Sequence, residues 1–367
     1  MPGDTLLFFA SLCLFLSSVE YAVPKPLPFM RLGLANLPVV FAVKSFRPRD
    51  VFFLILLKIL LSAFISGTMF SYVFLFSAAG SLASGLAVYV LHALLRECSG
   101  DRLISNVGLC LFGALANNAA QVVVARLVIF GPQAYVIAPL LLASGLVSGL
   151  ALGVFANKFE EKSAFLKAAG EGRERPLPQV AAGGEGDAPA VPAAGGGAFR
   201  IARAVAALVL MLLLPFLPGL RSKAAVWCVL LVLDEVARKG RVRLLPSFIM
   251  IAGLTVLSLL APSGKVLYEL GGFRITRDAL EAGLSKGLTL TGMLFASQLV
   301  FDGLRGRILG QGGGAGCGVL GMVGSVFSDF SRLSGRKLDI KGRGLMAALD
   351  GRLCEVWQGT AGTGGKE

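Results

Sequence analysis

The sequence predicts an all-α protein that crosses a membrane several times, and three observations support this fold class. Hydrophobic residues make up 55% of the 367 residues and charged residues only 16%, whereas soluble domains carry about 25% charged residues. The mean hydropathy is +0.75. The apolar residues also gather in runs that suit membrane helices of about 20 residues. We therefore expect a polytopic protein with a six-helix bundle and a second bundle of about four or five helices.

The first half of the chain contains six apolar runs, at about 5–21, 32–44, 51–69, 72–95, 104–128 and 134–156. Basic residues concentrate after every second run, at Lys44, Arg47, Arg49, Arg96, Arg102, Lys158 and Lys162. The positive-inside rule puts these segments in the cytoplasm. We therefore expect a multi-pass protein of the cytoplasmic (inner) membrane, with its N-terminus inside.

Composition divides the rest of the chain. Residues 160–198 are rich in Ala, Gly, Pro and Glu with almost no large apolar residues, a composition that cannot offset the entropy of ordering. Further apolar runs follow at about 202–220, 224–237, 244–262 and 286–304, with Thr276 expected to cap the helix that leads into the last one. The expected division is a membrane domain at 1–159, a flexible cytoplasmic linker at 160–198, a second membrane domain at 199–304, and a basic cytoplasmic or interfacial tail at 305–367.

Polar residues inside the apolar runs are candidates for a binding site, because a polar group in hydrocarbon is costly and normally has a function or a partner. The candidates are Arg31, Asn36, Lys58, Asn117, Asn118 and Gln121. Asn117 and Gln121 share one helix face, being four residues apart. Two interpretations stay open. The amides either line a pocket or form hydrogen bonds between helices. Lys58 either contacts a ligand or has a structural role, paired with Glu20 or with an amide.

Several other function classes are disfavoured. The formal charge of +13 comes from cations between apolar runs rather than from a nucleic-acid-binding face. The six cysteines are scattered and His92 is the only histidine, so metal and disulfide sites are not predicted. No phosphate-binding motif of the form G-x-x-x-x-G-K-[ST] occurs. We therefore expect no enzyme activity, no bound cofactor and no nucleic-acid partner. Glycines at 145, 149 and 153 are expected to allow close helix packing.

The segment Arg31-Leu-Gly-Leu-Ala-Asn-Leu-Pro38 resembles the loop and second helix of the substrate-binding (S) components of energy-coupling factor transporters, which often read "lGLaNlP". The resemblance covers residues 5–157 and points to the Gx transporter family, also labelled heptaprenyl diphosphate synthase component I. The pattern "fxITrdaLeaGLskGLtLt" in the second half is similar to the transmembrane (T) component of the same transporters. The alanine pair by which S components commonly dock is missing, since Leu14 follows Ala10 four residues later.

The resemblance implies a membrane transport protein that takes up a small molecule with energy from a separate ATPase, which uses the ATP. In S components the ligand lies between the first-loop lid and the later helices, so Arg31 and Asn36 would form the lid or wall and the amides the floor. T components seat Ala-Arg-Gly motifs in the ATPase. The tail offers only Gly342-Arg343-Gly344, so coupling through Arg343 and Gly344, binding of membrane lipids by the basic tail, and use of a separate T component all stay open.

The family's second label implies an alternative function, a non-catalytic membrane subunit associated with polyprenyl (heptaprenyl) diphosphate synthesis. The catalytic role would need diphosphate held by magnesium on clustered aspartates, and Asp234, Glu235 and Asp302 stand apart from any such cluster.

The composition of the linker gives a testable prediction. Protease added to inside-out vesicles should cut between Gly170 and Gly197, because this stretch lacks the apolar residues that would fold it. Two protected membrane fragments should remain on an immunoblot. Right-side-out vesicles are the control, and cleavage in these vesicles alone would contradict both the linker and the topology.

Overall fold

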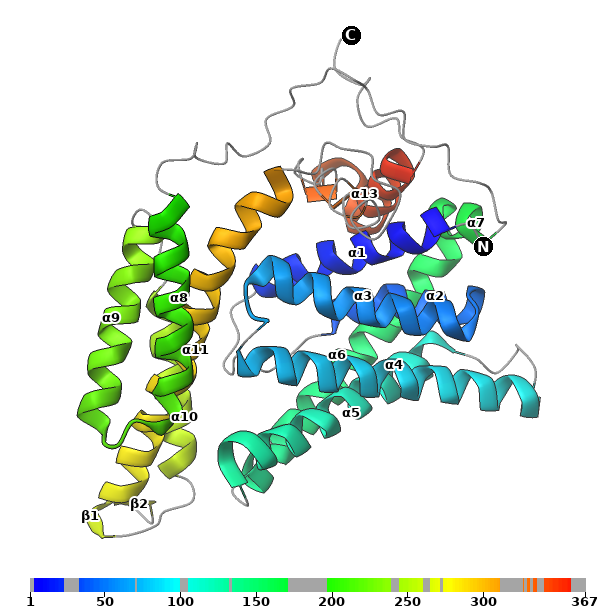
Figure 1. The fold of residues 1–367 in the computed structure, drawn as a ribbon. Coiled ribbons are helices and arrows are strands. Elements are labelled where there is room, and N and C mark those ends of the chain that lie inside the picture. The colour runs from blue at the N-terminus through cyan, green and yellow to red at the C-terminus, as the bar shows by residue number, and fades with distance from the viewer. Residues whose placement is uncertain are drawn as a thin grey trace.

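The computed structural model describes residues 3–22, 33–69, 71–99, 105–131, 134–170, 197–238, 244–259, 265–270 and 273–310, together with 326, 329–330, 333–334 and 340–357. These residues fold almost entirely into helices that form two bundles (Figure 1). Three apolar stretches, Tyr72–Glu97, Asn106–Val128 and Ala138–Lys162, are long enough to cross a membrane. The predicted fold class, an all-α membrane protein, is confirmed.

The first bundle contains the helices that the six apolar runs predict. They are α1 (Gly3–Ala22), α2 (Leu37–Ser45) with the short 3-10 helix η1 (Leu34–Asn36), α3 (Pro48–Ser66), α4 (Tyr72–Ser99), α5 (Asn106–Val124) and α6 (Ala134–Lys162). A π-helical segment, η3 (Ala125–Phe130), extends α5. The prediction of a full span at 32–44 is wrong, because α2 has only nine residues and helices rise about 1.5 Å per residue against an apolar thickness of about 30 Å.

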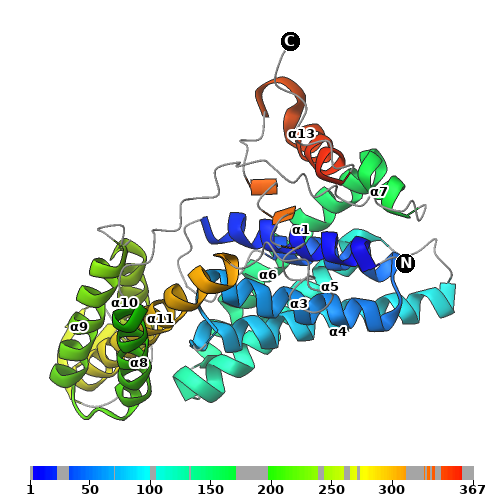
Figure 2. The same ribbon diagram turned by 45° about the horizontal axis from the view of Figure 1, so that its top comes forward.

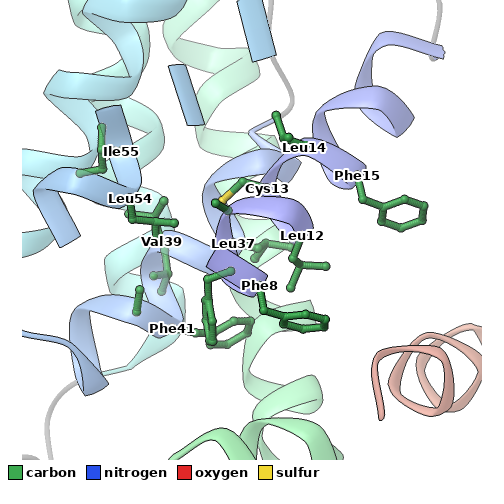
Figure 3. Close-up of a cluster of buried hydrophobic side chains, with 14 of the residues drawn as sticks. Phe8, Leu12, Cys13, Leu14, Phe15, Leu37, Val39, Phe41, Leu54 and Ile55 are labelled. Atoms are coloured by element: carbon green, nitrogen blue, oxygen red, sulfur yellow. The ribbon is translucent and has the colours of Figure 1, made fainter. Parts of the chain in front are cut away.

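Helix α1 is buried between α2 and α3 on one side and α13 on the other (Figure 1). Its residues from Leu7 to Phe15 are almost all buried, and Figure 3 shows Phe8, Leu12 and Cys13 among side chains from α2 and α3. Glycines let the outer helices approach one another. A Cβ on Gly149 would lie 3.0 Å from the Cα of Leu111 on α5. The expected close packing at the glycine stripe of α6 is therefore confirmed.

The second bundle is built around the long helix α11. It consists of α8 (Gly197–Leu213) with η5 (Leu214–Phe216), α9 (Leu220–Arg238), α10 (Leu244–Leu259) and α11 (Arg277–Gly310). Its core gathers Ala207, Met211, Trp227, Leu230, Phe295, Ala296 and Leu299. Inside this core the indole N–H of Trp227 donates to the hydroxyl of Thr291 at 2.8 Å, so the buried polar atom of the tryptophan is satisfied.

A hairpin that the sequence did not predict joins α10 to α11. Strands β1 (Val266–Leu270) and β2 (Phe273–Thr276) pair antiparallel. Helix α11 begins directly after Thr276, as expected, but the predicted side-chain cap is wrong. The hydroxyl of Thr276 is buried and has no hydrogen-bond partner among the described residues, because Thr276 already belongs to the strand.

The two bundles meet where α11 passes the ends of α3 and α4. The hydroxyl of Ser297 donates to the carbonyl of Gly67 at 2.6 Å, and the hydroxyl of Tyr72 contacts the sulfur of Met250 at 3.0 Å. In both ribbon views α1, α3 and α4 run crosswise to α8 and α9 (Figures 1 and 2). The helices of both bundles therefore cannot stand upright in one bilayer in this arrangement.

The C-terminal part of the chain folds back onto the first bundle. Helix α13 (Ile340–Trp357) lies against α1 and α7 (Ala164–Gly170) (Figure 1). The rings of Phe8, Phe165 and Trp357 have centroids 5.1–5.6 Å apart. Helix α13, within the residues 305–367 that the sequence assigns to a basic cytoplasmic or interfacial tail, thus contributes to the core of the first bundle.

Two helices run across boundaries that composition suggested between the domains. Helix continues to Lys162 in α6 and from Ala164 to Gly170 in α7, within residues that composition assigned to the linker. Helix α11 extends to Gly310, beyond the expected domain boundary at 304. The physical reason in α7 is tertiary. Asp350 of α13 accepts hydrogen bonds from Ser163 and from the amides of Ala164 (3.0 Å) and Phe165 (3.2 Å), which satisfies the start of α7.

These contacts predict that Asp350→Ala loosens α13 from the first bundle. Losing a helix cap typically costs about 1–2 kcal/mol, so the purified protein should show a lower Tm and faster proteolysis of α13. Glu355→Ala on the same helix is the matched control, because Glu355 is exposed and forms a surface ion pair with Arg352 at 3.3 Å, and such pairs contribute about 0–1 kcal/mol. Equal effects of the two substitutions would contradict the role of Asp350.

Candidate functional site

A small cavity lies inside the first bundle, between η1, α2, α4, α5 and α6. The described residues that line it are Gly33, Asn36, Leu37, Val40, Ser84, Val88, Leu109, Cys110, Gly113, Ala114, Asn117, Asn118, Ser148 and Leu152. Its volume is about 20 Å³, which is room for roughly one water molecule. Three of the residues that the sequence proposed for a site, Asn36, Asn117 and Asn118, therefore share one cavity.

Asn36 reaches the cavity because its side chain does not cap a helix. It stands at the N-cap of α2, a position where Asn normally accepts a hydrogen bond from the first turn, yet its side chain makes no such bond. Its backbone amide donates instead to the carbonyl of Gly33 at 2.9 Å. Gly33 has φ 83°, a left-handed conformation that favours glycine. This turn places the Asn36 amide over the cavity.

The side chain of Lys58 forms a hydrogen bond with the side-chain amide of Asn36. Its side chain is 3% exposed in the middle of α3, and its ammonium donates to Asn36 Oδ1. Lys58 does not line the cavity. One of the two interpretations of Lys58 was that it pairs with Glu20 or an amide for structure. The structure shows such a contact with an amide, and this amide belongs to Asn36, a residue of the candidate site.

The amides of α5 form a chain of hydrogen bonds that ends on α6. Asn118 Nδ2 donates to the backbone carbonyl of Leu141, and Asn117 Nδ2 donates to Asn118 Oδ1 at 3.1 Å. Glycines make room for these side chains. A Cβ on Gly145 would collide with the Asn118 amide, and one on Gly80 would collide with Asn117 Oδ1. Asn118 therefore joins two helices and also borders the cavity, so both interpretations of the amides apply to it.

Gln121 is buried without a hydrogen-bond partner. Its side chain is 0% exposed, and neither Oε1 nor Nε2 has a partner among the described residues. The Nε2 atom lies beside Gly80, 3.2 Å from where a Cβ on that glycine would be, and so close to Asn117. An unsatisfied buried amide costs about 1–3 kcal/mol. Gln121 does not line the cavity but lies one helical turn beyond Asn117, which does.

Three residues of the predicted site remain outside this geometry. Arg31 lies outside the described residues. Arg343 and Gly344 fall in the first turns of α13, and their side chains lie outside the described part of the structure. The expected coupling role of Arg343 and Gly344 and the expected lid role of Arg31 therefore stay predictions.

The sequence analysis missed two polar residues of the cavity wall, Ser84 and Ser148. Ser84 is 3% exposed, and the hydroxyl of Ser148 donates to the carbonyl of Gly145 at 3.3 Å. Both stand among small residues that suggested helix packing alone. A hydroxyl within an apolar run was the available signal, but serine is common at helix interfaces in membranes.

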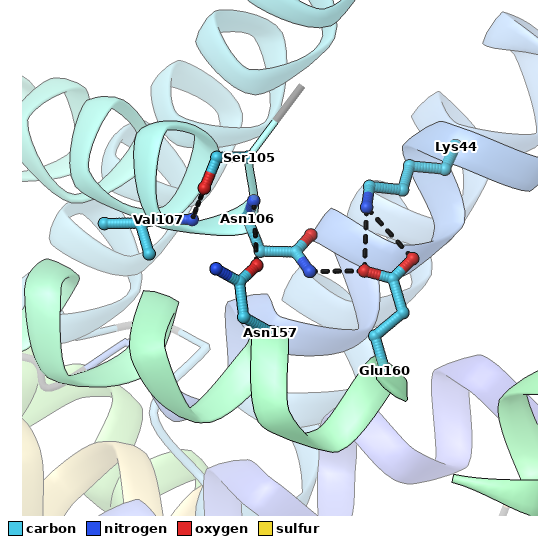
Figure 4. Close-up of polar contacts among 6 residues, drawn as sticks. All are labelled: Lys44, Ser105, Asn106, Val107, Asn157 and Glu160. Carbon is cyan, nitrogen blue, oxygen red and sulfur yellow. Dashed lines mark hydrogen bonds and ion pairs between the residues drawn. The ribbon is translucent and has the colours of Figure 1, made fainter. Parts of the chain in front are cut away.

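A second polar cluster closes the end of the bundle that the sequence places in the cytoplasm (Figure 4). Lys44 on α2 contacts both carboxylate oxygens of Glu160 on α6, at 3.0 and 2.8 Å. Asn106 Nδ2 on α5 donates to the same carboxylate, and the backbone amide of Asn106 donates to Asn157 Oδ1 at 3.2 Å. We call these four residues the inner cluster. It ties α2, α5 and α6 together.

An aromatic layer lies beside the inner cluster. The ring of Phe159 on α6 lies 6.2 Å from Phe41 on α2 and 5.8 Å from Phe155, centroid to centroid. Along α2, Val40 lines the cavity, Phe41 follows it, and Lys44 belongs to the inner cluster. The cavity is thus closed toward this end by an aromatic layer and then by an ion pair. Among the described residues, no group of three or more His, Cys, Asp or Glu could hold a metal ion.

Comparison with known proteins finds no match among curated proteins and none among solved structures. Residues 199–302 match a domain family of unknown function, so the resemblance of the second bundle to T components stays a prediction. Residues 9–159, which supply every residue of the cavity wall, match the family described as heptaprenyl diphosphate synthase component I. This match confirms the family resemblance of the first bundle.

Proposed function

We propose that this chain is a membrane transport protein whose first bundle captures a small molecule between η1, α2, α4, α5 and α6, where the cavity of about 20 Å³ is the closed form of a site that widens to admit the solute. The observation that carries the proposal is the amide cluster beside the cavity, where Asn117 borders the space and the neighbouring Gln121 is buried with no hydrogen-bond partner among the described residues. A structural helix contact satisfies its polar groups. A solute with polar groups would satisfy these amides and offset their desolvation.

In this proposal the chain performs no bond chemistry and binds no cofactor. Uptake is driven by a separate ATPase that acts through the second bundle. If the second bundle does not transmit the ATPase's action to the first, a separate T component does so. The crosswise arrangement of the bundles supports a change of orientation in the membrane (Figures 1 and 2). If the second bundle stands upright, the first lies on its side, with the ends of α3 and α4 against α11. A bundle that tilts between these orientations delivers its solute from the outer to the inner side.

The inner cluster supports tilting rather than passage through the bundle. A solute leaving by the inner end would have to separate Phe41 from Phe159 and break the contacts of Lys44 with Glu160. At the opposite end, the described residues that cover the cavity are the turn at Gly33 and the three residues of η1. The proposed path therefore uses the η1 end both for capture and for release.

The family description favours a second candidate function, a non-catalytic membrane component of a heptaprenyl diphosphate synthase. Its partner would then be a catalytic subunit rather than an ATPase. Co-purification distinguishes the two candidates. Recovery of an ATPase pair with the full-length chain supports transport, whereas recovery of a prenyl diphosphate synthase supports the second candidate.

Capture can be tested without knowing the solute. The full-length chain in nanodiscs is incubated with the small-molecule fraction of yeast extract, washed, and denatured to release what it retained for mass spectrometry. The wild type should retain a solute. Asn117→Leu and Gln121→Leu should each lower its retention at least about tenfold, because an unpaired ligand group costs about 1–3 kcal/mol.

Folding should change much less than retention in these variants, since interhelical amides contribute about 0.6 kcal/mol on average. Gln298→Leu on α11, an amide outside the cavity wall, is the control and should retain the solute as the wild type does. If both α5 variants retain it normally, or if neither accumulates in the membrane, the amides serve structure and the proposed site is wrong.

Coupling gives a separate prediction. If Arg343 seats in the ATPase, Arg343→Glu should abolish ATP-dependent uptake in vesicles while solute retention by the nanodisc protein stays unchanged. Arg336→Gln and Lys337→Gln are the matched controls and should leave uptake intact. A graded loss as Arg336, Lys337, Lys341 and Arg343 are neutralised one by one would instead indicate attraction to anionic lipid, worth about 1 kcal/mol per charge.

A further inference from the structure

We infer that a second site, separate from the cavity of the first bundle, binds the phosphodiester headgroup of an anionic phospholipid. The site is an open pocket between the first turns of α9 and α11, at the end of the second bundle that carries the hairpin (Figure 1). Its volume is about 630 Å³, within the range of about 300–1,000 Å³ that is usual for ligand pockets. The described residues that line it are Pro218, Gly219, Leu220, Arg221, Ser222, Arg277, Leu280, Glu281 and Leu284.

Two arginines from different helices meet in this pocket. Arg221 belongs to the first turn of α9, and Arg277 is the first residue of α11. Both side chains are exposed, and neither guanidinium forms a hydrogen bond or an ion pair with the residues that the structure describes. A guanidinium group presents its N–H donors in a planar fork that matches the oxygens of a phosphate. Two such cations at one pocket therefore favour an anionic ligand with a phosphate group.

The single carboxylate of the pocket limits the charge of this ligand. Glu281 stands one turn after Arg277 on α11 and also lines the pocket. Two guanidinium groups and one carboxylate leave one net positive charge. A lipid phosphodiester carries one negative charge, whereas a phosphate monoester carries about −1.5 to −2 at pH 7. The pocket is therefore complementary in charge to a phosphodiester.

The beginnings of the two helices add to the positive potential of the pocket. The first N–H groups of a helix have no partner within it and carry a partial positive charge. At α9 the hydroxyl of Ser222 donates to the carbonyls of Pro218 and Gly219 (3.0 Å for Gly219) and so does not act as an acceptor for the first turn. At α11 the hydroxyl of Thr276 has no partner among the described residues. Neither hydroxyl caps its helix, so both first turns contribute partial positive charge to the pocket.

Apolar residues beside the charges favour a lipid over a soluble anion. Leu220, Leu280 and Leu284 line the pocket together with its arginines. Phe216, two residues before the first residue of the pocket wall, is 83% exposed. Exposed apolar surface next to polar groups is typical of contact with a membrane or a partner. An acyl chain can lie on these residues while its phosphodiester contacts the two guanidinium groups.

The test uses the full-length chain in detergent micelles and native mass spectrometry, which resolves the lipids bound to each protein molecule. Phosphatidylglycerol is the probe, and phosphatidylcholine with the same acyl chains and no net charge is the comparison. The wild type should bind phosphatidylglycerol at least about fivefold more tightly than phosphatidylcholine. Inorganic phosphate, a soluble source of the same group, should not displace the bound lipid at millimolar concentration.

Variants of the charged residues connect this preference to the pocket. Arg221→Gln and Arg277→Gln should each weaken the binding of phosphatidylglycerol about fivefold, because each removes one charge near the headgroup. Glu281→Gln should strengthen it, since it removes the repulsive carboxylate. Lys265→Gln is the matched control. It removes an exposed cation at the same end of the bundle, where the Lys265 carbonyl accepts from the Arg277 amide at 3.1 Å, but it lies outside the pocket wall and should bind the lipid as the wild type does.

The Tm of each variant without lipid should stay near the wild-type value, because all four side chains are exposed. Equal affinity for the two lipids, or equal effects of Lys265→Gln and the arginine variants, would overturn the site. Displacement by inorganic phosphate would assign the pocket to a soluble anion and overturn the lipid. Solute retention by the first bundle does not enter these measurements, so this site can fail while capture stands.

Discussion

The close approach of α5 to its neighbours is the constraint on which the cavity depends. Three amides lie within five residues of α5, and each would collide with an ordinary side chain on the facing helix. Gly80 on α4 and Gly145 on α6 supply the missing volume at the points where these amides project. Without these two glycines the helices would have to separate, and the amide chain from Leu141 to Asn117 could not form. Packing and site therefore share the same residues.

The stability of the first bundle depends on the far end of the chain. Phe8 of α1 packs against Phe165 and Trp357, so the first and last described helices share one core. This contact closes a loop that contains the whole second bundle. Any movement of the first bundle against the second must either carry α13 along or break the aromatic contact. Moving α13 together with the first bundle costs less free energy, because it keeps the hydrogen bonds of Asp350 to the start of α7. Breaking them would leave helix amides unpaired, which is costly when they are buried.

Hydropathy predicted the helices of both bundles because a helix that lies in lipid must consist mainly of apolar residues. It failed where tertiary contacts decide the structure. The shortness of α2 follows from the left-handed turn at Gly33, and the helix α7 from a cap that lies 186 residues away in the sequence. The i, i+4 spacing placed Asn117 and Gln121 on one face correctly. Spacing could not predict the hydrogen bond between Lys58 and Asn36, which are 22 residues apart and on different helices. Each of these residues could have paired with several others.

The two ends of the cavity differ in what it takes to open them. At the inner end, an ion pair is backed by a layer of phenylalanines, so opening separates aromatic rings and exposes charges in a partly buried place. At the other end, η1 is a single turn of 3-10 helix, and Gly33 can change its backbone angles at low cost. Asn36 belongs to this turn, and its side chain accepts a hydrogen bond from Lys58 while its backbone amide donates to Gly33. A solute captured as proposed, with a hydrogen bond to Asn36, would stabilise the closed turn, so that capture and closure would be one event.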